Sequence, residues 1–242
     1  MVGAEGGIRC YWLSKMLYFA PMEDIIYRIA VSLPGFLLAI VCHEAAHAWM
    51  AFRFGDPTAK FQGRLTLNPL VHYDLVGTII FPLIGAMMGG AMFGWAKPVP
   101  VDSRRFKNVR SGIFWVSFAG PLANLILMVV CAFLLAVMTT KVSPNFSYHS
   151  VFSAMLTQSI WINVLLAVFN LIPFPPLDGS KMVSALLDYN QARKFEELQR
   201  FSFVFIFILI LTPILSYIMA PAIWVSNVLV NIFIHLLASM SF

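Results

Sequence analysis

Long apolar stretches separated by short polar ones dominate the chain. A helix rises about 1.5 Å per residue and the hydrocarbon core of a bilayer is about 30 Å thick, so about 20 consecutive apolar residues predict one crossing. Together with the segment described next, this pattern predicts an all-α polytopic membrane protein with about five or six transmembrane helices. The stretches that predict crossings are 29–52, 112–138, 151–172, 201–219 and 222–240.

Residues 76–94 are apolar but differ from the other stretches. They contain Pro82 and four glycines between Gly85 and Gly94. Broken backbone at membrane depth is tolerated where it is buried against protein or lines a wet cavity. We therefore expect a re-entrant or partial segment near 76–94. The preceding residues, 53–75, are polar and rich in turn formers, and they predict a short irregular or β region.

The two ends of the chain carry their own signals. Residues 1–28 contain a short apolar piece that is interrupted by Lys15 and followed by Pro21, too short to cross a bilayer. We predict an N-terminal interfacial segment there. The final apolar stretches, divided around Pro221, predict a C-terminal transmembrane helix pair over 201–242, which leaves 29–200 as the core.

Composition narrows the class of protein. Of the 242 residues, 60% are hydrophobic and 11% are charged, against about 25% charged in an ordinary soluble domain. These values exclude a disordered chain and an ordinary soluble enzyme. The three cysteines form no disulfide pattern. The net charge of +5 is explained by loops that face the cytoplasm and anionic lipid, so we expect the bilayer as a partner and no nucleic acid.

The first apolar stretch contains the sequence His43-Glu44-Ala45-Ala46-His47, which matches HExxH. Positions i and i+4 share one face of a helix, so both imidazoles can reach one metal ion. Glu44 lies beside them, where it can take a proton from an attacking water. Ionisable groups inside a membrane helix are costly and usually functional. The pattern therefore predicts a metal site in the membrane.

Two histidines leave a catalytic zinc ion short of ligands, because such an ion typically takes three protein ligands and a water. Asp178 is a candidate for the third. It follows an apolar helix and the three prolines Pro173, Pro175 and Pro176, which break the helix. An ordinary turn at a helix end explains Asp178 equally well, so its spacing alone leaves the third ligand open.

Five motifs follow one another along the chain: HEAAH, GRLTLNPLVHYD, FGWAKPVPV, AGPLAN and NLIPFPPLDG. In this order they resemble the motifs of the site-2 protease family of intramembrane zinc metalloproteases. The likeness is greatest to small bacterial and archaeal members without PDZ or CBS domains. The resemblance implies one Zn²⁺ per chain, held by His43, His47 and Asp178, with Glu44 as general base. Residues 29–200 are then the intramembrane metalloprotease core.

The resemblance also implies roles for four further residues. Asn170, which begins NLIPFPPLDG, is expected to hold an extended substrate strand, and Asn124, which ends AGPLAN, to face the site as an oxyanion donor. Hydrogen bonding between helices is the alternative for both. His72 and Asp74 match positions common in this subgroup, where they either support the site from behind its ligands, brace a loop or contact substrate.

The three ligands also constrain topology. They reach similar depth only if the helices at 29–52 and 151–172 run parallel, which requires an even number of crossings between them. The helices at 112–138 and 151–172 supply two, so 76–94 should be re-entrant. Of 16 Lys and Arg residues, 12 lie in 53–111 and 173–200. A spanning 76–94 with the N-terminus inside gives the same division of 12 to 4, so the charge count does not decide between the two topologies and the ligand argument is followed. In both cases loop 173–200 is cytoplasmic, in a multi-pass protein of the cell membrane with the active site opening toward the cytoplasm.

The function predicted from these features is zinc-dependent hydrolysis of peptide bonds in or near the transmembrane segments of membrane-protein substrates. The substrate helix must unwind, and pairing with the 53–75 region as an added strand would hold it extended. The alternative is a membrane metal-ion transporter that uses His43, His47 and Asp178 as a transit site. An inactive relative that retains membrane proteins is a third interpretation. The sequence leaves the oligomeric state open.

Overall fold

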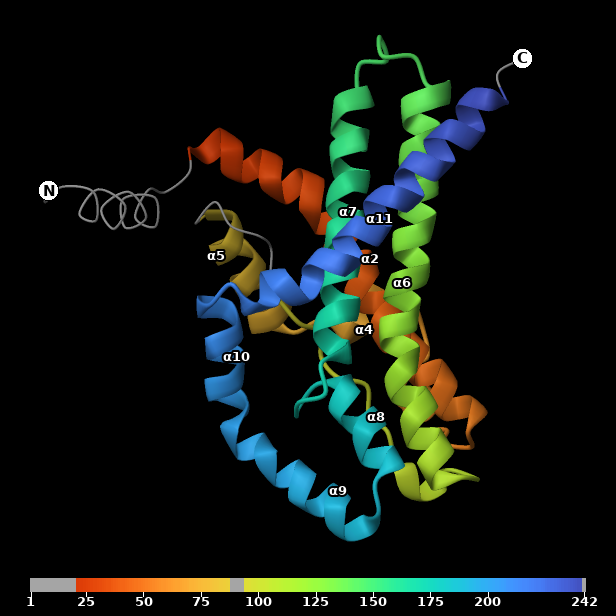
Figure 1. The fold of residues 1–242 in the computed structure, drawn as a ribbon, viewed down its shortest axis with the longest axis vertical. Helices are drawn as coiled ribbons and strands as arrows, with labels where there is room; N and C mark the ends of the chain where they lie inside the picture. Colours follow the sequence, from red (N-terminus) through yellow and green to blue (C-terminus); the bar gives the residue numbers. More distant parts are fainter. Residues whose placement is uncertain (1–20, 88–93, 241–242) are drawn as a thin grey trace, which may run out of the picture.

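The computed structural model describes residues 21–87 and 94–240, and these are mostly helical with no strand among them. Four helices in the described part are long and apolar enough to cross a membrane. The prediction of an all-α polytopic membrane protein is confirmed (Figure 1). The four helices are α2 (Met22–Arg53), α6 (Val109–Lys141), α7 (His149–Leu171) and α11 (Ile214–Ser239).

The N-terminal boundary differs from the predicted one. Residues 1–20 of the expected interfacial segment lie outside the described residues, and Met22 to Arg28 already belong to α2. At 32 residues α2 is about 48 Å long, more than a hydrocarbon core requires. Pro34 lies inside this helix, where the missing N–H removes one backbone hydrogen bond.

Helices α2, α6 and α7 pack together and hold the core. Gly35 of α2 lies directly against Ser159 of α7, and further along both helices His43 lies near Asp178, which follows α7. These contacts advance in the same direction along both helices, so α2 and α7 run parallel, as the ligand argument required. Helix α6 runs in the opposite direction. Its first part packs at Val116 against Ala51 near the end of α2, and further along, Asn124 contacts Ala39, which lies earlier in α2.

The segment near 76–94 is re-entrant, as predicted. It begins with the π-helix η1 (Leu75–Ile80) and continues as α5 (Phe81–Met87). Together they are about 20 Å long, which is too short for a crossing. The returning chain meets its own beginning, because Trp95 N–H donates to Gly77 O at 3.1 Å and Lys97 N–H donates to His72 O at 2.8 Å.

Short helices connect these elements. The 53–75 region is irregular, with two four-residue helices and no β structure, so the irregular form of the prediction is the observed one. A chain of short helices after α7 curves away from the bundle before it rejoins α11 (Figure 1). The short helices are α3 (Thr58–Phe61), α4 (Pro69–His72), η2 (Ser103–Arg105), α8 (Asp178–Leu186), α9 (Tyr189–Glu196), η3 (Glu197–Phe201) and α10 (Ser202–Leu211).

The C-terminal region differs from the predicted helix pair. The break falls at Thr212 and Pro213, and α11 continues through Pro221. A residue before proline is pushed out of the helical region, and Thr212 is extended accordingly. With ten residues, α10 is too short to cross alone. The two predicted spanning helices are therefore one short helix and one long one, and the described residues contain four spanning candidates rather than five or six.

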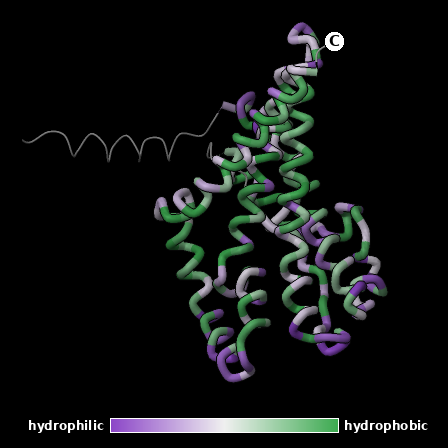
Figure 2. Tube along the Cα trace, turned by 45° about the vertical axis from the view of Figure 1, so that its right-hand side comes forward, coloured by the Kyte–Doolittle hydropathy of each residue, from purple (hydrophilic) through white to green (hydrophobic). Residues whose placement is uncertain are grey.

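The interior of the bundle is built from small side chains. Ala39, Ala48, Ala132 and Ala136 are fully buried, whereas many large apolar residues of the spanning helices are exposed. Small residues at helix interfaces are typical of membrane proteins, because lipid gives no hydrophobic drive and close packing must supply the attraction. Figure 2 shows apolar positions along the length of the long helices and polar positions mainly at the ends of the molecule.

Candidate metal centre and active site

Three predicted ligands meet in one buried cluster. His43 and His47 lie one turn apart on α2, and their Nε2 atoms are 3.0 Å apart. The Oδ2 atom of Asp178 lies 3.2 Å from the first Nε2 and 3.1 Å from the second. All three residues are buried, with 6% to 8% of their surface exposed. In the described part of the chain they form a group that could hold a metal ion.

The outer nitrogen of each imidazole has its own partner. His47 Nδ1 lies 2.7 Å from the carbonyl oxygen of Val116, which can only accept, so Nδ1 carries the hydrogen. His43 Nδ1 lies 2.6 Å from Oδ1 of Asn124. In neutral imidazoles with this arrangement both Nε2 atoms present lone pairs toward the Asp178 carboxylate. Three electron-rich atoms that converge in a buried place repel one another, and a bound metal cation would remove that cost.

The size of the cluster suits zinc. Ligand atoms about 2.0–2.1 Å from one tetrahedral ion lie roughly 3.3–3.4 Å apart, close to the observed spacing. The backbone of α6 leaves room for an ion at Gly120. A Cβ atom placed on Gly120 would lie 2.7 Å from both Cε1 and Nε2 of His43. Because glycine has only a hydrogen atom in place of a side chain, Gly120 keeps the space between the ligands open.

Asp178 is delivered to the cluster by the proline-broken end of α7. The chain leaves α7 at Leu171 and starts α8 at Asp178, where Gly179 allows close approach to the Leu171 carbonyl oxygen. The second carboxylate oxygen, Oδ1, accepts a hydrogen bond from Lys181 Nζ at 3.1 Å. Lys181 therefore turns one oxygen away from the cluster and leaves Oδ2 for the metal.

Glu44 lies beside the ligands on α2 but makes a different contact. Its Oε2 accepts a hydrogen bond from the backbone N–H of Val99 at 2.8 Å. Val99 belongs to residues 94–102, which have no helix or strand and follow the re-entrant part of the chain. Extended backbone is favoured here because Lys97 and Val99 each precede a proline, and Asp102 is extended. Pro98 and Pro100 on either side have no N–H, so Val99 supplies the single backbone donor of this tripeptide.

The segment 94–102 is fixed along its length. Arg64 Nη1 donates to Pro98 O at 2.6 Å, and Asp102 N–H donates to the buried Asp56 at 2.7 Å. Hydrogen bonding from the Arg104 side chain lowers the pKa of the Asp102 carboxyl to about 2. The ionised carboxylate also accepts a hydrogen bond from the backbone N–H of Arg104. The contact to Glu44 is thus made by a well-anchored segment.

The other predicted residues lie outside the ligand cluster. Asn170 donates from Nδ2 to Leu166 O in its own helix at 3.0 Å, and makes no hydrogen bond to the ligands among the described residues. His72 is buried and its Nε2 donates to Thr66 O at 2.9 Å. Asp74 accepts from Gly77 N–H at 2.7 Å. The last two brace the loop before the re-entrant segment.

Asn124 is fully buried and contacts a ligand directly. Its Oδ1 faces His43, and its Nδ2 donates to Ala39 O at 3.1 Å and to Asn163 Oδ1 at 2.9 Å. Both amide hydrogens are used in this way. A role as oxyanion donor stays a prediction, and it requires the amide to exchange one of these partners for substrate.

Sequence reasoning missed four contributors: Asn163, Gly120, Lys181 and the N–H of Val99. Asn163 gave a usable signal, because it is an amide within an apolar helix and polar groups there need partners. The others gave none. The open space at Gly120 and the hydrogen bond of Val99 depend on which segments approach α2, and this is decided by the tertiary fold.

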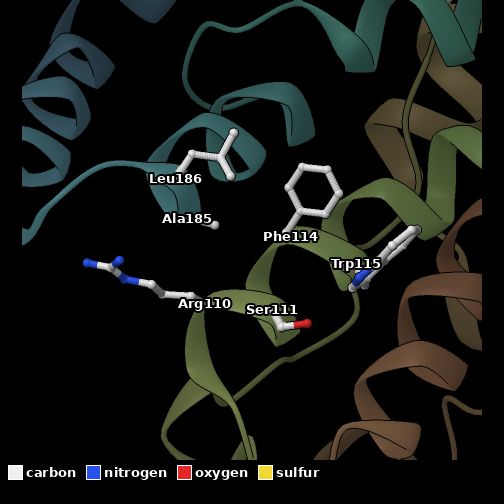
Figure 3. Close-up of a pocket in the computed structure, with 6 residues that line it drawn as sticks. All are labelled: Arg110, Ser111, Phe114, Trp115, Ala185 and Leu186. Atoms are coloured by element: carbon white, nitrogen blue, oxygen red, sulfur yellow. The ribbon is translucent and has the colours of Figure 1, made fainter.

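A separate surface hollow of about 360 Å³ lies between the start of α6 and the end of α8. Figure 3 shows Phe114 and Leu186 facing each other across it, with Arg110 extending from one side. Its lining includes none of the three ligands and not Glu44. The candidate active site is therefore the buried cluster and not this hollow.

These observations define a polytopic helical membrane protein with a buried His–His–Asp group beside a glutamate. Comparison with protein families agrees with this class. Residues 32–212, about three quarters of the chain, match Peptidase family M50. The chain belongs to this family, the site-2 protease family, and is a zinc metalloprotease. No solved structure matches the chain.

Curated relatives carry corresponding names. The chain is 39% identical over 213 residues to "Putative zinc metalloprotease YwhC" of Bacillus subtilis, which covers 86% of this chain and 90% of that protein. It is 31% identical over 185 residues to "Putative zinc metalloprotease Rip2" of Mycolicibacterium smegmatis, and 30% identical over 182 residues to the protein of the same name from Mycobacterium tuberculosis. The latter two matches each cover 75% of this chain and 67% of the relative.

Proposed function

We propose that this protein is an intramembrane zinc metalloprotease of the HExxH type, which hydrolyses peptide bonds in or near transmembrane segments of membrane-protein substrates. The observation that carries the proposal is the convergence of His43, His47 and Asp178 on one point, with Glu44 on the same helix. This cluster lies within a body of four helices that are long enough to cross a membrane. In this proposal the three converging residues hold Zn²⁺.

The chemistry assigned to the protein groups follows from their positions. Zinc, when bound, supplies a Lewis acid for the scissile carbonyl and lowers the pKa of water. Glu44 is the general base, which takes a proton from the attacking water and later delivers it to the leaving amine. Its Oε2 is held by Val99 N–H, so Oε1 is the oxygen free for this transfer.

A substrate has to be extended before its peptide bond is exposed, because a helical amide is hydrogen-bonded and shielded by side chains. The 53–75 region was expected to pair with it, but the structure places α3 and α4 there. Residues 94–102, which have no helix or strand and in which two prolines favour extended backbone, lie beside Glu44 instead. We assign Asn170, at the last turn of α7, to contact with the extended substrate.

Orientation follows from the basic residues. Loops 53–75, 95–111 and 173–200 lie at the same end of the bundle, because α2 and α7 run parallel and α6 runs opposite to them. These loops carry 12 of 16 Lys and Arg residues. By the positive-inside rule this end faces the cytoplasm of a cell-membrane protein. The ligands lie toward this end, so the site opens to the cytoplasm.

The proposal is tested with purified protein in liposomes and a membrane-anchored reporter substrate. We expect Glu44→Gln to keep zinc and to lose cleavage by at least 100-fold, because the base is removed while the ligands remain. Zinc content is measured by metal analysis and cleavage by gel. Full cleavage by Glu44→Gln would contradict the assignment. Zinc flux by the wild type without cleavage would favour the transporter alternative.

A further inference from the structure

Two amides are buried between the three central helices without being ligands or bases. Asn124 of α6 and Asn163 of α7 are 0% and 2% exposed. A buried amide without partners costs free energy, and the oxygen and the nitrogen of both amides each have a hydrogen-bond partner here. Their partners form one continuous chain of hydrogen bonds from α7 through α6 to His43 on α2.

The direction of this chain is fixed at two backbone carbonyl groups, which can only accept. Asn163 Nδ2 donates to Ser159 O at 2.8 Å, so its Oδ1 is the atom that faces Asn124. Asn124 must therefore present Nδ2 to Asn163, and the same Nδ2 donates to Ala39 O at 3.1 Å. Its Oδ1 is left to face His43 Nδ1, at 2.6 Å.

The reversed arrangement would disable a ligand. If the Asn124 amide turned over, its Oδ1 would face Asn163 Oδ1 and Ala39 O, and three acceptors would meet without a hydrogen. Nδ2 would then donate to His43 Nδ1, and in the neutral ring the hydrogen would move to Nε2. That hydrogen would point into the ligand cluster, where a metal requires a lone pair.

We propose that Asn163 is a positioning residue for the metal centre, which holds the orientation of Asn124 and thereby the metal-binding tautomer of His43. The inference rests on the proposed role of His43 as a zinc ligand. His47 needs no such device, because its Nδ1 donates to the carbonyl of Val116, which has one possible role. A side-chain amide can present either end, so the orientation of Asn124 is set by its own partners, the carbonyl oxygen of Ala39 and Oδ1 of Asn163 together.

The test measures zinc affinity of the full-length protein in detergent by competition with a chelator. Removing an outer partner of a metal-binding histidine typically costs 10- to 100-fold in affinity. We expect Asn163→Ala to weaken zinc binding by about 10-fold, and Asn124→Ala by at least as much. The control is Ser159→Ala, one turn before Asn163. It removes a hydroxyl that donates to Met155 O, and it keeps the backbone carbonyl that accepts from Asn163. It should bind zinc as the wild type does.

A double variant separates positioning from a general structural effect. If Asn163 acts through Asn124, adding Asn163→Ala to Asn124→Ala should leave zinc affinity unchanged. The visible spectrum of Co²⁺-loaded protein should likewise change on Asn163→Ala alone and not in the Asn124→Ala background. Asn163→Leu, which has the same branched shape without polar atoms, repeats the measurement if the alanine variant unfolds, and thermal unfolding of each variant is recorded.

Each outcome decides the inference. Unchanged zinc affinity in both Asn163 variants would overturn it. The inference would also fail if Asn163→Ala lowered zinc affinity in the Asn124→Ala background as much as it does in the wild type. Either result leaves the proposed protease function intact as long as the wild type binds zinc. A folded wild-type protein that binds no zinc would overturn the proposed function and this inference with it.

Discussion

At the scale of single residues, the metal centre depends as much on an absent side chain as on the ligands. His43 and His47 sit one turn apart on α2, and α6 passes over them at Gly120. Glycine is poorly suited to a helix interior, costing about 1 kcal/mol relative to alanine. The site therefore uses a residue that the helix by itself disfavours, because any larger one would occupy the ion's place.

This predicts an unusual response to Gly120→Ala. We expect zinc binding to fall below detection, because the added methyl group fills the space between the imidazoles. The methyl group also overlaps both buried imidazoles, and this overpacking outweighs the helix preference for alanine, so the thermal stability without metal should fall. Metal analysis of the purified variant measures the first effect and thermal unfolding without metal the second. Ser117→Ala, on the same helix, adds no atom to the site and should keep zinc. Full zinc content in Gly120→Ala would contradict the assigned ligand geometry.

At the scale of elements, the segment 94–102 connects the re-entrant part of the chain to the proposed general base. Its backbone meets Gly77 and His72 on one side and Glu44 further along. The prolines at 98 and 100 favour extended backbone and remove competing donors. A single N–H, that of Val99, is thereby offered to the carboxylate.

Val99→Pro tests this contact, because it removes the N–H where both neighbours already favour extended backbone. A hydrogen bond to a charged group contributes about 1.5–3 kcal/mol, so we expect turnover to fall by about 10- to 100-fold with zinc content unchanged. Val99→Ala keeps the N–H and serves as the control. Steady-state cleavage of the reporter gives kcat and KM. A rise in kcat would show that the contact restrains Glu44 instead of positioning it.

At the scale of the whole molecule, the position of one proline changes the topology. Two C-terminal crossings would return the end of the chain to the basic side. The break at Pro213 instead leaves α11 as the one long helix after α10, and it ends near Lys141, whose Nζ donates to Met240 O at 3.4 Å. The end of α11 therefore lies on the same side as the loop after α6.

Labelling of single cysteines from outside the membrane tests this topology, in a background that lacks Cys10, Cys42 and Cys131. We expect reporters at Phe146 and Met240 to react from the same side and a reporter at Leu186 from the opposite side. All three positions are exposed in the structure. If the reporters at Met240 and Leu186 reacted from the same side, the chain would cross the membrane twice after residue 200, as first predicted. That result would contradict α11 as the one crossing in this region.

The sequence by itself determined the helical membrane class, the re-entrant segment and the HExxH pair. These are properties of local pattern: apolar length, Gly and Pro content, and the i to i+4 spacing on a helix. Once the family resemblance supplied Asp178 as the third ligand, the sequence also required parallel helices for α2 and α7, because three ligands must share one ion. The C-terminal pair was predicted wrongly, since Pro213 and Pro221 look alike in sequence and only one of them ends a helix.

The tertiary structure alone decided how the ligands are held. The Asn163–Asn124–His43 chain, the open space at Gly120 and the hydrogen bond from Val99 to Glu44 each join residues far apart in sequence. Buried polar groups must find partners, but the sequence does not state which ones. The identity of those partners depends on how closely three helices approach and at what depth, and this follows from packing of small residues along their whole length.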